Sequence, residues 1–340
     1  MTKRIFKAST LKELAAILAD LPVPDEKYRQ LAQERQNILT KPPGSLGVLE
    51  EISVFLAGWQ GTVLPEINKA QALVFAGNHG VCNQGVNPYP QEVTAQMVEN
   101  FKNGGAAINQ LCRENNADLD VVALDLDNPT KDFTQEVAMS ETEVLAAMEK
   151  GATSVNSSAD ILLLGEMGIG NSTVAAALSC ALFGGPTEKW VGPGTGSDKQ
   201  GITVKINAIN EGLKLHAGLI DDPLKLLCAF GGREQAAIAG AIIAARMLKI
   251  PVVLDGFICT AAAAVLSSFD EALDHCLVAH QSSEPGHEAL LQKIQKSAIL
   301  NLEMRLGEGS GAALSLGIIR SALACHNGMA TFADAGISES

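Results

Sequence analysis

From residue 71 onward, short apolar runs alternate with longer segments whose apolar residues recur at the period of a helix. Such alternation indicates a mostly parallel sheet with helices packed on both of its faces. The predicted strands are residues 72–76, 119–124, 161–164, 252–254 and 277–279. The helices expected among and after them are residues 104–115, 140–155, 172–183, 200–215, 233–248, 258–267, 286–299 and 311–326.

The N-terminal segment carries helical patterns only, over residues 10–20, 25–38 and 46–58. Pro42-Pro43-Gly44-Ser45 separates the second pattern from the third, and Ser45 is placed to cap the third. The last helices, after residue 286, lack an obvious partner strand, so we expect them to pack with the N-terminal helices. The sequence thus predicts a large, Rossmann-like α/β substrate-binding domain (66–285) and a small helical domain (1–65 with 286–340).

The charge and the cysteines exclude several classes of protein. A net charge of -13 without a basic stripe argues against binding to nucleic acid or to an anionic membrane. The apolar stretch 236–266 is interrupted by Arg246, Lys249 and Asp255, which favours a helix-strand-helix unit over a membrane span. Seven isolated cysteines and an N-terminus without an apolar signal region predict a cytoplasmic protein with reduced thiols.

Two glycine-rich loops precede predicted helices and are candidates for binding phosphate. In the first, Gly165 and Gly170 have the spacing of a Walker A loop, but Asn171 occupies the lysine position. Backbone N–H groups at a helix N-terminus then suit a single phosphate better than a phosphate pair with magnesium. The second loop, 191–198, precedes a helix that carries Lys205. For either loop alone, a tight turn without a ligand is the alternative.

Among the charged residues, Glu308 is the most unusual, because it lies between glycines where an apolar helix begins. It is either a catalytic carboxylate or a charge that complements the helix dipole. His79, in the loop after the first strand, is either a base or a histidine that holds backbone carbonyls. The six histidines and the cysteines have no metal-ligand spacing, so we expect no zinc site.

Eight motifs, in this order, closely resemble the nicotinate-nucleotide:dimethylbenzimidazole phosphoribosyltransferase family, and the similarity spans nearly the whole chain. They are residues 41–47 (KPPGSLG), 77–81 (GNHGV), 165–173 (GEMGIGNST), 192–196 (GPGTG), 231–234 (GGRE), 254–257 (LDGF), 284–287 (EPGH) and 305–309 (RLGEG).

The resemblance implies transfer of 5-phosphoribosyl from nicotinate mononucleotide to 5,6-dimethylbenzimidazole. The products would be alpha-ribazole 5'-phosphate and nicotinate, with inversion at the anomeric carbon. The leaving base is already cationic and departs neutral, so one general base suffices, and Glu308 fits that role. Glu166 would stabilise an oxocarbenium-like transition state near the sugar. A transferase that uses adenine or a phenol as the acceptor, and a catalytically silent nucleotide-binding protein, are the alternatives.

The resemblance also implies which residues contact the small-molecule substrates. Contacts with the donor's phosphate and ribose are expected at Gly168, Gly170, Asn171, Ser172, Gly194, Thr195, Gly196 and Lys205. Further polar contacts on that side are expected from Asp255 and Ser283. The acceptor slot would use Gln91, with Met167 and Leu306 as walls and Tyr89 and Asn83 as additions, and Arg305 would hold the catalytic loop or a carboxylate. A homodimer without metal or bound cofactor is implied.

Overall fold

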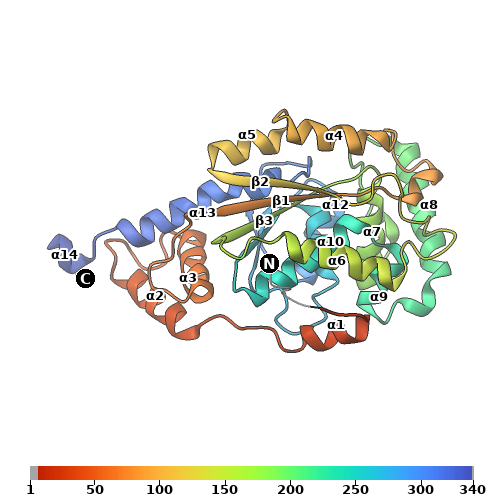
Figure 1. Ribbon diagram of the computed structural model, residues 1–340. Helices are drawn as coiled ribbons and strands as arrows, with labels where there is room; N and C mark the ends of the chain where they lie inside the picture. Colours follow the sequence, from red (N-terminus) through yellow and green to blue (C-terminus); the bar gives the residue numbers. More distant parts are fainter. Residues whose placement is uncertain (1–6, 339–340) are drawn as a thin grey trace.

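Six parallel strands form one sheet in the computed structural model, which describes residues 7–338 (Figure 1). The strands are β1 (Ala70–Ala76), β2 (Ala117–Ala123), β3 (Ile161–Met167), β4 (Val252–Leu254), β5 (Cys276–His280) and β6 (Ala298–Leu300). Their order across the sheet is β2-β1-β3-β4-β5-β6, so the direction of the connections reverses between β1 and β3. The predicted parallel sheet is confirmed.

Helices cover both faces of the sheet, as the sequence predicts. One face carries α6 (Glu141–Ser154), α7 (Asn171–Phe183), α10 (Arg233–Met247) and α11 (Phe257–Ala264), with α1 (Leu11–Leu18), α8 (Lys199–Leu215), α9 (Pro223–Phe230) and α12 (Pro285–Lys293) around them. The other carries α3 (Val48–Gln60), α4 (Glu92–Lys102), α5 (Ala107–Glu114) and α13 (Ser310–Gly328). The remaining elements are α2 (Glu26–Ile38), α14 (Phe332–Ala335) and the short 3-10 helices η1 (Gly80–Gln84), η2 (Thr187–Lys189) and η3 (Ala217–Leu219).

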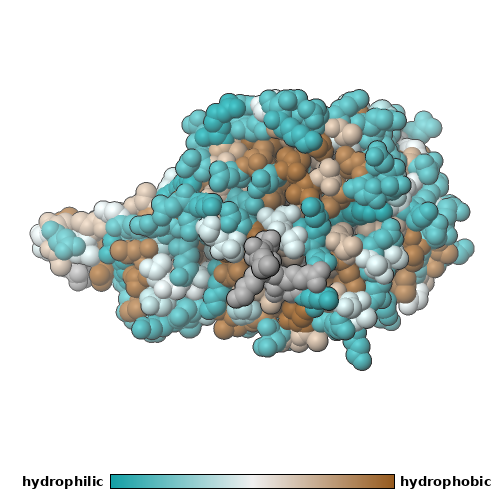
Figure 2. All heavy atoms as spheres, in the orientation of Figure 1, coloured by the Kyte–Doolittle hydropathy of each residue, from teal (hydrophilic) through white to brown (hydrophobic). Residues whose placement is uncertain are grey.

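Successive side chains of β1 divide between two hydrophobic cores, since strand residues alternate between faces. Leu73 and Phe75 enter the core beneath α6 and α10, whereas Ala72 and Val74 enter the core beneath α3, α5 and α13. All of β1 is buried, but the edge strand β2 alternates between half-buried and exposed residues. Figure 2 shows a hydrophobic area where Figure 1 places this edge, below α4 and α5, on an otherwise mostly hydrophilic face.

The expected helix over residues 286–299 is wrong in its second half. Helix α12 ends at Lys293, and after Gln295, whose φ of 55° does not continue a helix, residues Ala298–Leu300 form β6 beside β5. Three apolar residues are too few for periodicity to separate a strand from the end of a helix. Helices α4 and α9 were also missed, although the Asp222-Pro223 pair that begins α9 is a recognisable start signal.

Helix α13 packs against both α3 and the strands β3 and β5. Together with α14 it runs outward from the sheet past α2 and α3 (Figure 1). The N- and C-terminal helices therefore do meet. The division of the chain into domains of 66–285 and 1–65 with 286–340 remains a prediction, and β6, at residues 298–300, belongs to the sheet.

Candidate active site

A cleft opens at the carboxyl ends of β3, β4 and β5. Its walls come from the loop between β3 and α7, the loop before α8, and the loop that leads into α13. Ligands of open parallel sheets bind beyond the carboxyl ends of the strands, where the direction of the connections reverses. The cleft is in that position, because β3 adjoins the reversal between β1 and β3.

One end of the cleft is built to attract an anion. Helix α7 begins at Asn171 after Gly170, whose φ of 91° suits glycine. Lys205 from α8 donates to the Ser172 hydroxyl (3.3 Å) and to the Gly192 carbonyl (3.2 Å). Burial lowers the pKa of Lys205, and a bound phosphate would favour its charged form. A helix N-terminus and one cation thus converge on this end.

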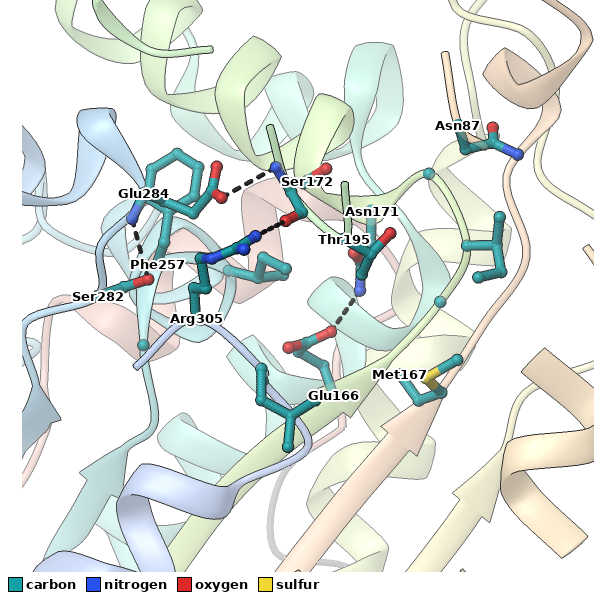
Figure 3. Close-up of a pocket in the computed structure, with 18 of the residues that line it drawn as sticks. Asn87, Glu166, Met167, Asn171, Ser172, Thr195, Phe257, Ser282, Glu284 and Arg305 are labelled. Atoms are coloured by element: carbon teal, nitrogen blue, oxygen red, sulfur yellow. Dashed lines mark hydrogen bonds between the residues drawn. The ribbon is translucent and has the colours of Figure 1, made fainter. Parts of the chain in front are cut away.

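Glu284 was not predicted, yet it lies at the same end, at the N-cap of α12. Its Oε1 accepts from the Gly194 N–H (2.9 Å), and its own N–H donates to the Ser282 hydroxyl (3.2 Å). Arg305 donates to the Gly194 carbonyl (2.9 Å), so both polar groups of that glycine are engaged. Burial raises the pKa of Glu284, whereas nearby Lys205 lowers it. Figure 3 shows Glu284, Arg305 and Ser172 grouped together.

The opposite end of the cleft contains carboxyl groups. Glu308 and Glu166 both line it, with 7% and 4% of their surface exposed, and the Glu308 N–H donates to the Glu166 carbonyl (3.2 Å). Asn171 donates to Glu166 through its side-chain amide (Figure 3). Burial raises the pKa of Glu308, and burial together with Asp255, Glu234 and Glu308 raises that of Glu166 well above its ordinary value. These carboxyls readily hold or accept a proton.

The backbone around Glu308 is in an unusual conformation. Gly307, Glu308 and Gly309 have φ values of 85°, 64° and 79°, all in the left-handed region. Glutamate rarely adopts this conformation, and such outliers persist only where surrounding contacts hold them. A Cβ on Gly307 would lie 2.5 Å from a Glu166 carboxylate oxygen, so glycine is needed there for space as well. The Gly-Glu-Gly sequence fits this turn.

Asp255, at the end of β4, is 1% exposed and supports the same turn. It accepts from the N–H groups of Gly309 (3.1 Å) and Ala312 (3.0 Å), one with each carboxylate oxygen. Burial raises its pKa to about 7, although the backbone N–H groups act in the opposite direction. His280 at the end of β5 has its Nδ1 3.7 Å from Asp255 Oδ1, and burial lowers its pKa.

A largely apolar wall faces the carboxyl groups. Val86, Pro88, Met167 and Leu306 form it with Asn87, and Leu306 is 51% exposed. Gln91 was expected here but does not line the cleft, because its side-chain amide donates to the His79 carbonyl (2.9 Å) and so holds the loop after β1. Its expected contact with the acceptor remains a prediction.

The cleft brings together most of the residues that the sequence singled out. Those that line it are Glu308, Glu166, Met167, Gly168, Gly170, Asn171, Ser172, Gly194, Thr195, Lys205, Asp255, Arg305 and Leu306. Gly196 and Ser283 do not; both are exposed, and Ser282 lines the cleft in place of Ser283. Whether any of these residues contacts a substrate remains a prediction. Glu284, Ser282 and His280 were missed as site residues, although all three follow the fifth predicted strand.

His79 lies outside the cleft lining and is fully buried. Its Nε2 is 3.1 Å from Glu234 Oε1 at the start of α10, and both side chains are 0% exposed. The expectation that this histidine holds backbone carbonyls is therefore wrong, since its side chain pairs with a carboxylate. The pair joins the loop after β1 to α10 behind the site.

Within residues 7–338, no three His, Cys, Asp or Glu side chains are grouped so that they could hold a metal ion. In the same part of the chain, no helix combines the length and apolar character needed to cross a membrane.

Comparisons with known proteins agree with this geometry. A family model described as "Phosphoribosyltransferase" matches residues 21–337. The nicotinate-nucleotide:dimethylbenzimidazole phosphoribosyltransferase of Rhodobacter capsulatus is 57% identical, over 98% of this chain and 100% of the relative. That of Ruegeria sp. TM1040 is 53% identical, over 97% and 98%. The crystal structure of CobT from Thermus thermophilus superposes with a TM-score of 0.85 at 38% identity and covers 92% of this chain and 100% of that one.

Proposed function

This chain belongs to the nicotinate-nucleotide:dimethylbenzimidazole phosphoribosyltransferase family, and we propose that Glu308 is the general base of its reaction. The enzyme transfers phosphoribosyl from nicotinate mononucleotide to dimethylbenzimidazole. The observation that carries the proposal is a buried carboxylate, held on a left-handed turn, at the end of the cleft that faces the apolar wall.

The donor's phosphate binds at the N-terminus of α7, beside Lys205 and the loop that contains Gly194. Buried N–H groups and one cation are well suited to a monophosphate. The ribose then lies between this end and the carboxyl groups. That orientation brings the anomeric carbon towards Glu166 and the acceptor wall.

At the anomeric carbon, the bond to the pyridinium nitrogen breaks and its electron pair neutralises the departing nicotinate ring. A nitrogen of dimethylbenzimidazole attacks from the opposite face, which inverts the configuration and gives alpha-ribazole 5'-phosphate. The other ring nitrogen loses its proton to Glu308. Because burial raises the pKa of Glu308, its carboxylate is a stronger base than an exposed one.

Glu166 contributes charge rather than proton transfer. Its raised pKa allows it to hold a proton in the empty cleft, and the cationic donor favours its ionised form. Once ionised, it stabilises the positive charge that develops on the ribose ring in the transition state. The side-chain amide of Asn171 keeps this carboxylate in place.

Substitution of the base tests the mechanism. Glu308→Gln should lower kcat by about 10³-fold and change the KM for nicotinate mononucleotide by less than about threefold, because only proton transfer is lost. Glu303→Gln, in the same loop but exposed and outside the cleft lining, is the matched control and should retain full activity. Full activity in Glu308→Gln would contradict the proposed mechanism.

The acceptor is tested with the same assay. The apolar wall of Val86, Pro88, Met167 and Leu306 favours a flat, apolar ring with one hydrogen-bonding edge. Turnover with dimethylbenzimidazole should therefore exceed turnover with adenine or a phenol. A preference for adenine or a phenol would leave the donor chemistry intact and change the assigned acceptor.

The enzyme is further proposed to act as a homodimer in the cytoplasm. The family resemblance supports the dimer, and the free cysteines among the described residues support a reducing compartment. Sedimentation at the mass of one 35.6 kDa chain would contradict the dimer.

A further inference from the structure

Both oxygens of the Asp255 carboxylate accept hydrogen bonds from the segment that carries Glu308. Its Oδ2 accepts from the Gly309 N–H and its Oδ1 from the Ala312 N–H, at 3.1 and 3.0 Å. Asp255 follows directly after β4 in the middle of the sheet, whereas the two N–H groups begin α13. Although Asp255 lines the cleft, its hydrogen-bonding capacity is directed towards this loop.

The loop requires such support. Three consecutive residues, 307–309, have left-handed φ values, and the middle one is a glutamate, for which this conformation is unfavourable. Within the loop, Ser310 donates to the Gly307 carbonyl with both its N–H (3.1 Å) and its hydroxyl (2.7 Å). Those bonds close the turn, but they do not tie it to the sheet. Among the described residues, the turn is tied to the sheet only by the hydrogen bonds to the Glu166 carbonyl and to the Asp255 carboxylate.

His280 packs beside Asp255, with its Nδ1 3.7 Å from the carboxylate oxygen Oδ1. Its ring lies between Gly256 and Gly311, where a Cβ at either glycine would be 2.8 and 2.0 Å from a ring atom. A Cβ at Gly311 would also be 2.8 Å from Asp255 Oδ1. The imidazole, the carboxylate and the first turn of α13 are therefore in close contact, and the glycines provide the space for it.

We propose that Asp255 is a positioning residue that fixes the general base Glu308 and is not a contact for the donor. This inference rests on the proposed function of Glu308. A base must lie within hydrogen-bonding distance of the proton it removes, and a displacement of about 1 Å can cost about 100-fold in rate. Asp255 sets that distance because it anchors the residue directly after Glu308 to a strand of the sheet.

The variant Asp255→Asn tests this role. Asparagine keeps the shape, but it presents an NH₂ group where one backbone N–H needs an acceptor. We expect kcat to fall by about 100-fold and the KM for nicotinate mononucleotide to change by less than about threefold. Asp222→Asn is the matched control, since Asp222 caps α9 away from the cleft, and its kinetics should not change. A tenfold rise in donor KM at unchanged kcat would overturn the proposal and make Asp255 a donor contact.

A double variant separates positioning from general loss of structure. If Asp255 acts through Glu308, then Asp255→Asn in a Glu308→Gln background should lower kcat by less than about threefold further. A further 100-fold loss there would overturn the proposal while leaving Glu308 as the base. Full activity of Glu308→Gln alone would instead remove the proposed function on which the inference rests. The two failures are thereby distinguishable.

A second variant covers the case in which Asp255→Asn does not fold. Ala312→Pro replaces the N–H that donates to Asp255 Oδ1 by a ring CH₂ group that would meet this oxygen, and so breaks the anchor without substituting the aspartate. Proline is tolerated in the first turn of a helix, where residue 312 lies. Donor binding measured by calorimetry should persist while kcat falls at least tenfold. Unchanged kcat in this folded variant would contradict the anchoring role.

Discussion

The two ends of the cleft differ in charge and in how the chain builds them. The proposed phosphate end combines the α7 N-terminus, Lys205 and Arg305 with one carboxyl group, that of Glu284, whereas the opposite end gathers Glu166, Asp255 and Glu308. In the proposed binding mode, the anionic phosphate of the donor lies at the first end and its cationic base towards the second. This difference in charge favours an orientation in which the reactive carbon faces the carboxyl groups.

The largest effect at the phosphate end is expected from loss of its buried cation. Lys205→Met should lower kcat/KM for nicotinate mononucleotide by about 100-fold, because a hydrogen bond to a charged group contributes about 1.5–3 kcal/mol. The KM for dimethylbenzimidazole should remain within about twofold. Lys199→Met, exposed at the start of the same helix, is the control. A loss that affected the acceptor instead would break the assignment of the two ends.

The pH dependence probes the carboxyl end. Glu308 accepts a proton only when ionised, so activity present above its pKa is lost as the pH falls through it, about tenfold per pH unit. Since burial raises this pKa, the acid limb of kcat/KM for the acceptor should have its midpoint above 4.5, the ordinary value. The residual activity of Glu308→Gln should lack this limb, with titration of free dimethylbenzimidazole measured separately. A midpoint at or below 4.5 would contradict a buried base.

The smallest effect is expected from a hydroxyl at the phosphate end. Ser172→Ala removes the acceptor for Lys205 at 3.3 Å but leaves the Gly192 carbonyl as its second partner. Because Lys205 keeps its charge and its second partner, we expect a loss of only about 1 kcal/mol, so the KM for the donor should rise about fivefold with kcat nearly unchanged. A fall in kcat to the level of Lys205→Met would show that the hydroxyl, rather than the cation, organises this end.

Local signals were sufficient to predict much of the fold and the glycine-rich loop before α7. The apolar runs 72–76 and 161–164 predicted β1 and β3, and the glycines at 168 and 170 predicted a loop that opens a helix. Such signals work because strand pattern, glycine conformation and helix start depend on neighbouring residues. The failure at 286–299 has the same origin, since the three residues of β6 carry too little local pattern.

The sequence did not predict which side chains of the loops line the cleft, or which groups those side chains bond to. Gln91 and Ser283 were expected at the substrates, yet one bonds to the His79 carbonyl and the other is exposed beside Ser282. Glu284 was overlooked, although it lies in a motif that the sequence had marked. Several polar residues of a loop could face the cleft. The backbone and side-chain torsions that select one of them are set by neighbouring elements, and a single sequence does not show these torsions.

The sequence by itself determined the alternation of strands and helices, the glycine-rich loops and the position of Glu308 as a carboxylate between glycines. Only the tertiary structure decided that Asp255 holds that turn, because the two segments are more than fifty residues apart and meet through the parallel order of β3, β4 and β5. Hydrogen bonds to backbone N–H groups leave no pattern in the side chains of the donors. The acceptor of such N–H groups, here Asp255, becomes evident only once the strands are in register.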